Sequence, residues 1–335
     1  MRKEHLQYLA CPDCKAELSL AIEEEQEGRV KTGELSCAAC KLRFPVIGFI
    51  PRFVKEGHYA DSFGFQWFRH AKTQLDSVIG LPISKQRFFK VTRWGEDLTG
   101  EVILEVGCGA GRFTEVIAAT GAMVVSFDAS RGVEVNYESN GWRDNLMLVQ
   151  AELERMPFPP AFFDRAVSLG VLQHTADPHR SFLAIAFLVK KGGSFAVDVY
   201  KKSLARRLLS AKYWVRPLTA RMNPTVLYTL TRAWVSFWWQ PTSIIARFPQ
   251  GRRINRFLFF IADYRGYLPL PAAQLKEWAV LDNFDMLSPR YDNPTTAFEV
   301  RGWFEEAGFQ DVDADDEDNI VEGRGVRSAL SGKAR

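Results

Sequence analysis

The sequence predicts an α/β protein: a doubly wound, mainly parallel sheet, with a small ribbon ahead of it and a helical cap inserted into it. Three observations indicate this: residues 100–200 alternate apolar runs with amphipathic stretches, two cysteine pairs lie in the first 40 residues, and residues 201–262 contain 12 Lys and Arg but no Asp or Glu. With 335 residues, 47% of them hydrophobic, the chain can build one large domain plus an appendage. A net charge of +3 excludes a globally basic nucleic-acid binder, but not a local basic patch.

Residues 1–54 are predicted to form a cysteine-bearing ribbon of short strands. The pairs Cys11-Pro-Asp-Cys14 and Cys37-Ala-Ala-Cys40 are separated by 22 residues, which is the spacing of a zinc ribbon. Four thiolates would close a tetrahedral shell around a structural Zn²⁺ and leave no open position for catalysis. Because so small a module cannot build a large core, metal binding would supply much of its folding free energy. Metal-free or redox-active cysteines are the alternative.

Residues 100–200 are predicted to form the core of the protein. Strands that alternate with helical patterns imply crossover units and a parallel sheet with helices on both faces. Residues 291–335 are expected to return to this core as an amphipathic helix and two short strands. The strand candidates of the core are residues 102–106, 123–128, 146–153, 163–170 and 194–200.

The first strand candidate leads into a glycine turn that contains Gly107, Gly109 and Gly111. A dinucleotide fingerprint requires G-x-G-x-x-G, but Arg112 stands at its third glycine position, so we expect a ligand other than a pyrophosphate. Glu105 lies two positions before the first glycine, where a carboxylate would repel a phosphate and suit a cationic amino group. This pattern favours S-adenosylmethionine (SAM), which carries an ammonium and a sulfonium.

The other cofactor candidates follow the later strands. Asp128 ends the second strand candidate, about 20 residues beyond the turn, where a carboxylate can accept hydrogen bonds from both ribose hydroxyls. Glu152 follows the third strand and is placed to bind the adenine amino group. The remaining predicted contacts, the first of them expected to be a small filler and not a nucleophile, are Cys108, Ala129, Leu153 and Gly170.

In their order along the chain, these motifs resemble those of class I SAM-dependent methyltransferases of the bacterial, ubiquinone-biosynthesis-like type. The resemblance covers about residues 100–200 and rests on EVGCGAGRF, VSFDAS, AELERMPF, FFDRAVSLGVLQHTADP and LVKKGGSFAVDVY. Glu152 stands where Asp is commoner, and Gln173 where His often precedes His174. The resemblance implies a Rossmann-like, seven-stranded doubly wound sheet and methyl transfer from SAM.

The ribbon has a resemblance of its own. The stretches LQYLACPDCKAELSL and GELSCAACKLRFPVIGFIPRFV are similar to the small zinc-ribbon partner proteins that activate RNA and protein methyltransferases, here fused ahead of the catalytic domain. A ribbon also precedes the core in certain ribosomal-RNA guanine methyltransferases. RNA is therefore kept open as a substrate.

Residues 55–99, between the ribbon and the core, are predicted to form a helical linker or lid. Gln66 and Trp67, in SFGFQWFRH, are expected to cover the cofactor and to contact the acceptor substrate. Aromatic segments ahead of the core commonly cover the cofactor in methyltransferases of this class. Ordinary packing of a helix on the sheet edge is the alternative.

Residues 201–290 are predicted to form the inserted cap. Its basic and aromatic side chains suit the wall of an acceptor pocket, a peripheral contact with an anionic membrane through residues 201–262, or an RNA surface. A membrane-spanning helix is not expected, because the apolar stretch 225–246 is interrupted by Arg232, Gln240 and Pro241.

Candidate acceptor residues lie on both sides of the cap. His174 follows the fourth strand, where the acceptor should enter, and histidine suits a general base; a packing or helix-capping histidine is the alternative. The polar stretch 281–294 reads as a loop and weakly resembles methyltransferases of surface-glycan or natural-product biosynthesis. Its candidate acceptor contacts are Arg290 and Tyr291. No NPPY-like tetrapeptide follows the fourth strand, and its absence argues against the methylation of amino groups on bases or proteins.

The sequence thus predicts a SAM-dependent methyltransferase that acts on a small-molecule or lipid- or glycan-linked acceptor, most simply at a hydroxyl. One alternative is a ribosomal or transfer RNA methyltransferase, which would require the ribbon and the basic cap to share one face. Another is a non-catalytic adaptor that binds SAM without transferring its methyl group. The N-terminal stretch lacks the apolar segment of a secretory signal, so we expect a cytoplasmic protein, with or without peripheral contact with the inner face of the membrane.

Overall fold

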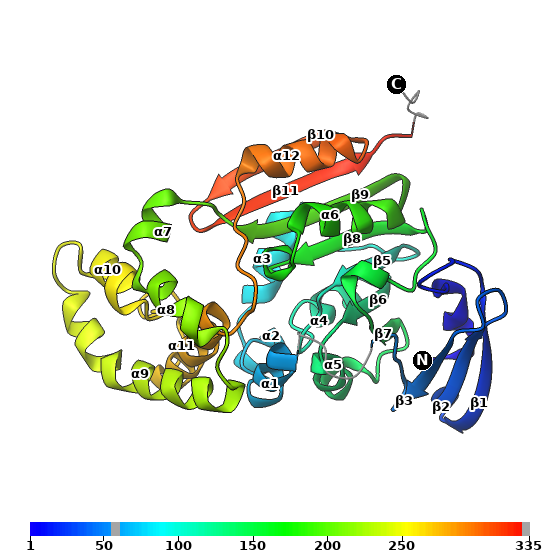
Figure 1. Ribbon diagram of the computed structural model, residues 1–335, viewed down its shortest axis with the longest axis horizontal. Helices are drawn as coiled ribbons and strands as arrows, with labels where there is room; N and C mark the ends of the chain where they lie inside the picture. The colour runs from blue at the N-terminus through cyan, green and yellow to red at the C-terminus, as the bar shows by residue number, and fades with distance from the viewer. Residues whose placement is uncertain (55–60, 330–335) are drawn as a thin grey trace.

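The computed structural model describes residues 1–54 and 61–329, and it places a ribbon at one end of the molecule, a mixed sheet in the middle and a helical cap at the other end (Figure 1). Residues 55–60 of the predicted linker and 330–335 of the predicted C-terminal part lie outside the described residues. The ribbon is an antiparallel sheet in the order β1-β2-β3-β4. Its elements are η1 (Lys3–Tyr8), β1 (Leu18–Gln26), β2 (Arg29–Cys37), β3 (Arg43–Ile47) and β4 (Ile50–Pro51).

The central sheet has seven strands in the order β10-β11-β9-β8-β5-β6-β7. The strands from β9 to β7 pair in parallel, while β11 is antiparallel to both of its neighbours. This arrangement confirms the predicted Rossmann-like, seven-stranded sheet. The strands are β5 (Val102–Val106), β6 (Met123–Asp128), β7 (Leu146–Gln150), β8 (Phe163–Leu169), β9 (Val189–Tyr200), β10 (Phe309–Glu317) and β11 (Ile320–Arg327).

Helices cover both faces of this sheet because its central strands are apolar on both sides. Ile103 and Val124 belong to the core cluster on one face, and Leu104 and Val125 belong to the cluster on the other. The chain leaves β5 toward β6 and β7 and later returns on the opposite side of β5 as β8, so a crevice is expected beyond the carboxyl ends of β5 and β8. The covering helices are α3 (Ile83–Thr92), α4 (Thr114–Ala118) and α5 (Gly132–Asn140) on one face, with α6 (Pro178–Leu188) and α12 (Ala297–Glu306) on the other.

The cap follows β9 and has its own apolar core, centred on Val235 and Phe284. The described residues include no helix that is long and apolar enough to cross a membrane. The two short helices before the core are α1 (Asp61–Arg69) and α2 (Asp76–Ile79). The cap consists of α7 (Leu204–Leu209), α8 (Ala211–Thr219), α9 (Pro224–Ile245), α10 (Gly251–Ile254), a π-helical turn η4 (Asn255–Phe259) and α11 (Ala272–Leu287).

The prediction of a loop over residues 281–294 is wrong for the first half of that stretch, because helix α11 continues to Leu287. Leu281, Phe284 and Leu287 are buried at spacings of three residues, so one face of the helix packs into the core of the cap. The two aspartates between them made this stretch look polar. In a helix they share another face, and that face belongs to the candidate site.

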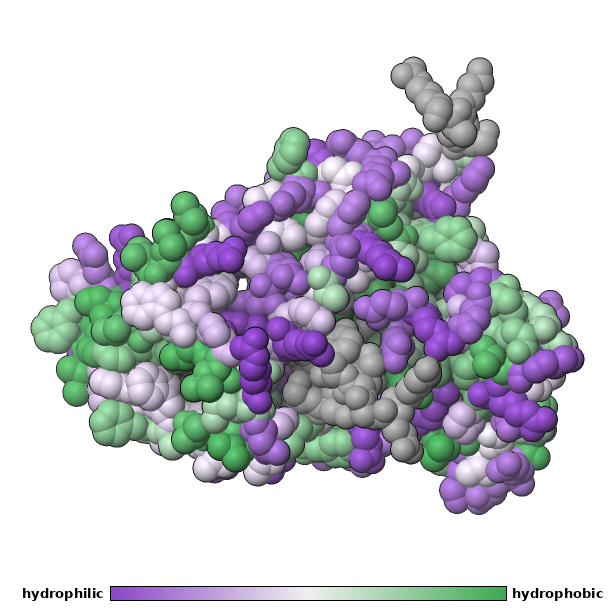
Figure 2. Space-filling model, in the orientation of Figure 1, coloured by the Kyte–Doolittle hydropathy of each residue, from purple (hydrophilic) through white to green (hydrophobic). Residues whose placement is uncertain are grey.

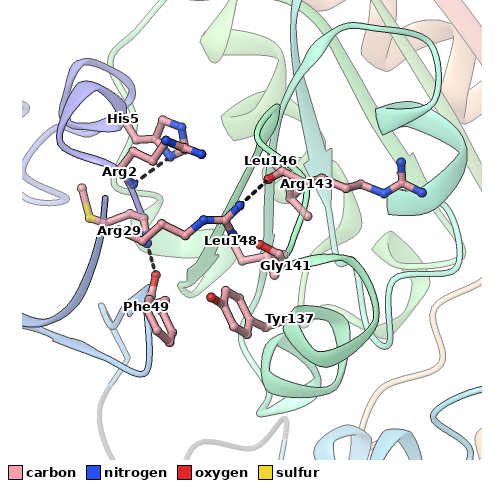
Figure 3. A pocket seen from close by; sticks show the side chains of 10 residues that line it. Arg2, His5, Arg29, Phe49, Tyr137, Gly141, Arg143, Leu146 and Leu148 are labelled. Atoms are coloured by element: carbon pink, nitrogen blue, oxygen red, sulfur yellow. Dashed lines mark hydrogen bonds between the residues drawn. The ribbon is translucent and has the colours of Figure 1, made fainter. Parts of the chain in front are cut away.

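The ribbon docks on β7, the edge strand of the large sheet. Arg52 forms a parallel bridge with Gln150, and the Phe53 amide donates to the Gln150 carbonyl at 2.8 Å. Buried ribbon residues such as Leu35 belong to the same core cluster as the sheet. Figure 3 shows Arg29 of the ribbon reaching across to the turn after α5, next to a space of about 10 Å³, which has room for about one water molecule. This contact is a packed interface and not a ligand site.

Candidate active site and metal centre

The four ribbon cysteines come together as the spacing predicts. Their Sγ atoms all lie within 4.8 Å of one another, while a tetrahedral zinc–thiolate site would place them about 3.8 Å apart. The two CxxC knuckles have the same turn: the Lys15 amide donates to the Cys11 carbonyl, and the Lys41 amide to the Cys37 carbonyl, both at 2.9 Å. Cys11, Cys14, Cys37 and Cys40 therefore fit a closed, structural Zn²⁺ site.

The glycine turn lies at the carboxyl end of β5. Gly107, Gly109 and Gly111 have φ values of +73°, +50° and +91°, a region in which other residues are strained. The Gly109 amide donates to one carboxylate oxygen of Asp128 at 2.9 Å, and the Ser130 amide donates to the other at 2.8 Å. The structure thus fixes the predicted ribose ligand, Asp128, beside the turn.

Glu105 lies beneath this turn and not on its surface. Its side chain is buried, and one carboxylate oxygen accepts hydrogen bonds from the hydroxyls of Thr114 and Ser126, both at 2.6 Å. Burial is the main reason that the pKa of Glu105 rises to about 7, since these two hydrogen bonds act in the opposite direction. Its contacts hold the turn on the sheet, and direct contact with a SAM ammonium stays a prediction.

Cys108 is buried in the same turn. Its burial, followed by the nearby carboxylates of Asp128 and Glu105, raises the pKa of the thiol well above its ordinary value. The protonated thiol is a poor nucleophile, which agrees with the role of a small filler.

Trp67 of α1 lies against the glycine turn. A Cβ at Gly109 would lie 2.7 Å from Cε2 of the Trp67 indole, and a Cβ at Gly132, the first residue of α5, would lie 2.8 Å from its Cδ1. The neighbouring Gln66 is fully buried and donates from Nε2 to Asp285 of α11 at 3.1 Å. The structure therefore brings both predicted lid residues to the cofactor crevice.

The loop after β8 forms the other wall of the crevice. A Cβ at Gly107 would lie 2.4 Å from a methyl group of Val171, so this loop touches the glycine turn. The Gly170 amide donates to Oδ1 of Asp198 at 2.6 Å, and Arg87 of α3 donates to Oδ2 of the same residue at 2.6 Å. Asp198, the acidic residue in the β9 run, thus fixes the loop that carries Gly170.

The three remaining cofactor candidates lie around the end of β7. Ala129 accepts a hydrogen bond from the Gln150 side chain at 3.0 Å through its carbonyl, and Glu152 precedes the 3-10 turn η2 (Leu153–Arg155), whose Leu153 is buried. They are therefore next to Asp128 through the β6–β7 pairing. Their contacts with the cofactor, including that of Glu152 with the adenine amino group, stay predictions.

The crevice fits SAM on two observations of the chain itself. The glycine turn and Asp128 lie side by side at the carboxyl ends of β5 and β6, which is the arrangement that nucleotide-binding crossover folds use to bind a ribose. In addition, Oε1 of Gln66 and both side-chain polar atoms of Gln173 are buried and have no hydrogen-bond partner among the described residues. Buried polar groups are normally satisfied, so these atoms are available to a bound ligand.

His174, in the 3-10 turn η3 (Leu172–His174), lies where the sheet edge meets the cap. Its Nδ1 lies 3.1 Å from the carbonyl oxygen of Tyr291, which can only accept, so Nδ1 carries the proton. Its Nε2 lies 3.9 Å from Oδ2 of Asp285, which also accepts a hydrogen bond from the Tyr200 hydroxyl at 3.2 Å. Tyr291 thus meets the predicted base through its backbone, while Arg290 is exposed and lies 5.5 Å from the centre of the Tyr291 ring.

A second carboxylate, that of Asp282, lies three residues before Asp285 in α11. Asp282 accepts a hydrogen bond from the Tyr264 hydroxyl and another from Gln74, and burial is the main reason that its pKa rises to about 6. Both aspartates belong to the polar stretch 281–294, but no role was predicted for them, nor for Tyr200 and Tyr264. The three-residue spacing of the aspartates, read as one face of a helix, was the available signal.

Comparisons with known proteins agree with this geometry. Residues 104–197 match the methyltransferase domain family, and residues 2–48 match the Trm112p-like protein family. The ubiquinone biosynthesis O-methyltransferase of Xylella fastidiosa (strain 9a5c) is 32% identical over 127 residues, which cover 36% of this chain and 52% of the relative. The enzyme of the same name from Paraburkholderia phymatum is 35% identical over 137 residues, which cover 36% of this chain and 55% of the relative.

The chain spans about half the length of the curated relatives that it matches. Among solved structures, the complex of the Haloferax volcanii Trm112 methyltransferase activator with a protein described as a methyltransferase aligns with a TM-score of 0.46 and 12% identity, over 82% of this chain and 97% of that one. The two family matches agree with the sheet, the glycine turn and the cysteine cluster. The chain therefore carries a class I SAM-dependent methyltransferase domain preceded by a Trm112p-like zinc ribbon.

Proposed function

We propose that this protein transfers a methyl group from SAM to a hydroxyl of a small-molecule or lipid- or glycan-linked acceptor. The observation that carries the proposal is the position of His174 between the glycine crevice and the cap, with Asp285 3.9 Å from its Nε2. A hydroxyl must lose its proton when it is methylated, so a base beside the acceptor is needed. Methylation of an amine places less demand on such a base.

Four parts of the chain have separate roles in the proposed reaction. Asp128 and the glycine turn hold the cofactor, which supplies an electrophilic methyl group on its sulfonium when bound. His174 accepts the hydroxyl proton at Nε2, because its Nδ1 already donates to the Tyr291 carbonyl. Asp285, whose Oδ2 lies 3.9 Å from Nε2, is then close enough to attract the positive charge of the imidazolium that forms. Tyr200 holds Asp285 in position.

The lid contributes positioning and exclusion of water. Trp67 covers the glycine turn, and Gln66 joins the lid to the cap through Asp285. Methyl transfer needs the acceptor oxygen in line with the sulfonium, so a closed wall around the acceptor accounts for much of the expected rate. Both residues are proposed to contact the acceptor or the cofactor.

The hydroxyl acceptor is favoured over RNA by two observations. The curated relatives at 28–35% identity are named ubiquinone biosynthesis O-methyltransferases, which supports an oxygen acceptor by analogy. In addition, the ribbon and the cap lie at opposite ends of the molecule in Figure 1. An RNA surface that uses both would therefore have to run the length of the molecule, past the sheet (Figure 1).

A lipid-linked acceptor is supported by the surface of the cap. Figure 2 shows apolar groups exposed over the cap at one end of the molecule. Leu204, Trp214 and Leu218 of α7 and α8 are 73%, 64% and 70% exposed, and residues 201–262 contain 12 basic and no acidic residues. Apolar side chains combined with basic charge suit a peripheral contact with an anionic membrane surface. We propose this contact for the protein inside the cell.

Incubation with methyl-labelled SAM and separated lysate fractions tests the proposal. Label in the small-molecule or lipid-glycan fraction is the expected result, and label in RNA or protein would contradict it. SAM binding without label in any fraction would favour the non-catalytic adaptor. A His174→Gln variant that binds SAM normally separates enzyme-dependent label from background.

A further inference from the structure

A second, larger hollow lies on the cap side of His174. It has a volume of about 1080 Å³ and lies between α7, α8 and the segment 290–294. Figure 2 shows hydrophilic side chains around this region, next to the apolar groups of the cap. Its lining contains five basic side chains and one acidic one, Asp292; the basic ones are Lys202, Arg207, Arg216, Arg221 and Arg290.

The charges of this hollow are only partly compensated. The Asp292 side chain is 5% exposed and lies 3.6 Å from Nε of Arg216 and 3.7 Å from Nζ of Lys212, so these cations already neutralise it. Arg207, Arg221 and Arg290 are exposed and form no ion pair with an acidic residue among the residues that the structure describes. A concave surface lined by one sign of charge concentrates its field, which favours an anionic ligand.

The floor of the hollow is rigid. Arg216 is buried and donates to the backbone carbonyls of Met286 and Pro289 at 2.7 and 2.9 Å, which ties α8 to the end of α11. One wall is also part of the candidate active site, since the Tyr291 carbonyl lies 3.1 Å from Nδ1 of His174. The Asn293 amide donates to the Gln173 carbonyl at 2.8 Å and fixes the same wall.

We propose that this hollow binds a phosphate-bearing group of the acceptor and so holds the acceptor hydroxyl toward His174. Guanidinium groups bind phosphate oxygens through paired, charge-assisted hydrogen bonds, and three of them border the hollow without an acidic partner. The inference rests on the proposed function for the direction of the acceptor, but not for the anion binding itself. The phosphate belongs either to a soluble metabolite or to a lipid headgroup.

Anion binding by the full-length protein tests the proposal without any need for turnover. The probes are inorganic pyrophosphate, followed by calorimetry, and phosphatidylcholine vesicles with and without phosphatidic acid, followed by sedimentation. The test variant is Arg207→Gln/Arg221→Gln. The matched control is Arg180→Gln/Lys191→Gln, which removes two exposed cations outside both the cap and the lining of the hollow.

We expect the test variant to bind the probe about tenfold or more weakly and the control to bind it as the wild type does. If the test variant loses pyrophosphate binding, the phosphate belongs to a soluble metabolite. If it loses only the binding of phosphatidic acid vesicles, the phosphate belongs to a lipid headgroup. Equal loss in both variants, or no binding of either probe by the wild type, would overturn the proposal. A wild-type protein that binds the probe but methylates no fraction would refute the proposed function and leave only the anion binding of this hollow standing.

Discussion

The carboxylate of Asp285 lies 3.9 Å from Nε2 of His174 and thereby joins the inserted cap to the carboxyl edge of the sheet. The same carboxylate accepts hydrogen bonds from Gln66 of the lid and from Tyr200 at the end of β9. Lid, sheet and cap therefore meet at one side chain. The predictions below test this meeting point and the sites on either side of it.

Replacement of the base should slow methyl transfer without weakening cofactor binding. We expect His174→Gln to lower the single-turnover rate by about 10²- to 10⁴-fold, the usual contribution of a positioned base, with an unchanged dissociation constant for SAM. Asp285→Asn should lower the rate less, because it weakens only the stabilisation of the imidazolium. An unchanged rate in His174→Gln would assign this histidine to packing.

A methyl group on the glycine turn should displace the lid. Gly109→Ala puts a Cβ 2.7 Å from the Trp67 indole at a φ of +50°, so we expect weaker SAM binding by calorimetry. Gly100→Ala is the matched control, because its φ is +86° but no atom lies within 4 Å of its Cβ. If the two variants lost SAM affinity equally, backbone strain and not the contact with Trp67 would explain the loss.

The predicted ribose ligand can be tested directly. Asp128→Ala removes the carboxylate that accepts from the Gly109 and Ser130 amides, so SAM affinity should fall below detection. Asp97→Ala, which removes an exposed carboxylate from the loop before β5, should bind SAM as the wild type does. Retention of wild-type affinity in Asp128→Ala would refute the ribose assignment.

The cysteine cluster should depend on all four thiolates. We expect Cys37→Ser to lose its zinc, measured by elemental analysis, and to open the ribbon to limited proteolysis. The buried Cys108 lies outside the cluster, so Cys108→Ser should keep the metal. Full zinc content in Cys37→Ser would reject the four-thiolate site.

The buried Glu105 predicts a pH dependence of stability. Its folded-state pKa of about 7 lies above the ordinary value of 4.5, so the folded protein binds the proton more tightly than the unfolded chain does. This residue therefore lowers the free energy of unfolding as the pH rises from about 4.5 to 7, by about 3 kcal/mol in total. Relative to the wild type, Glu105→Gln should flatten denaturant stability across that range, and parallel curves would contradict the assignment.

Local motifs were the predictable part of this protein. The CxxC knuckles and the glycine turn are fixed by residues close together in the sequence, and alternation of apolar runs was sufficient to predict the sheet. The candidate active site around His174 was harder to predict. Its side chains come from distant segments and meet only through the fold; they are Gln66, His174, Tyr200 and Asp285. The docking of the ribbon on β7 depends on an exposed strand edge, which no local pattern reveals.

The central claim is that the methyl group is transferred to oxygen. The most direct measurement is NMR of the product formed with ¹³C-methyl SAM, because the carbon shift reports the atom to which the methyl group is bonded. We predict an O-methyl signal that is absent when His174→Gln replaces the wild type. An N-methyl or C-methyl signal that persists in this variant would contradict the account.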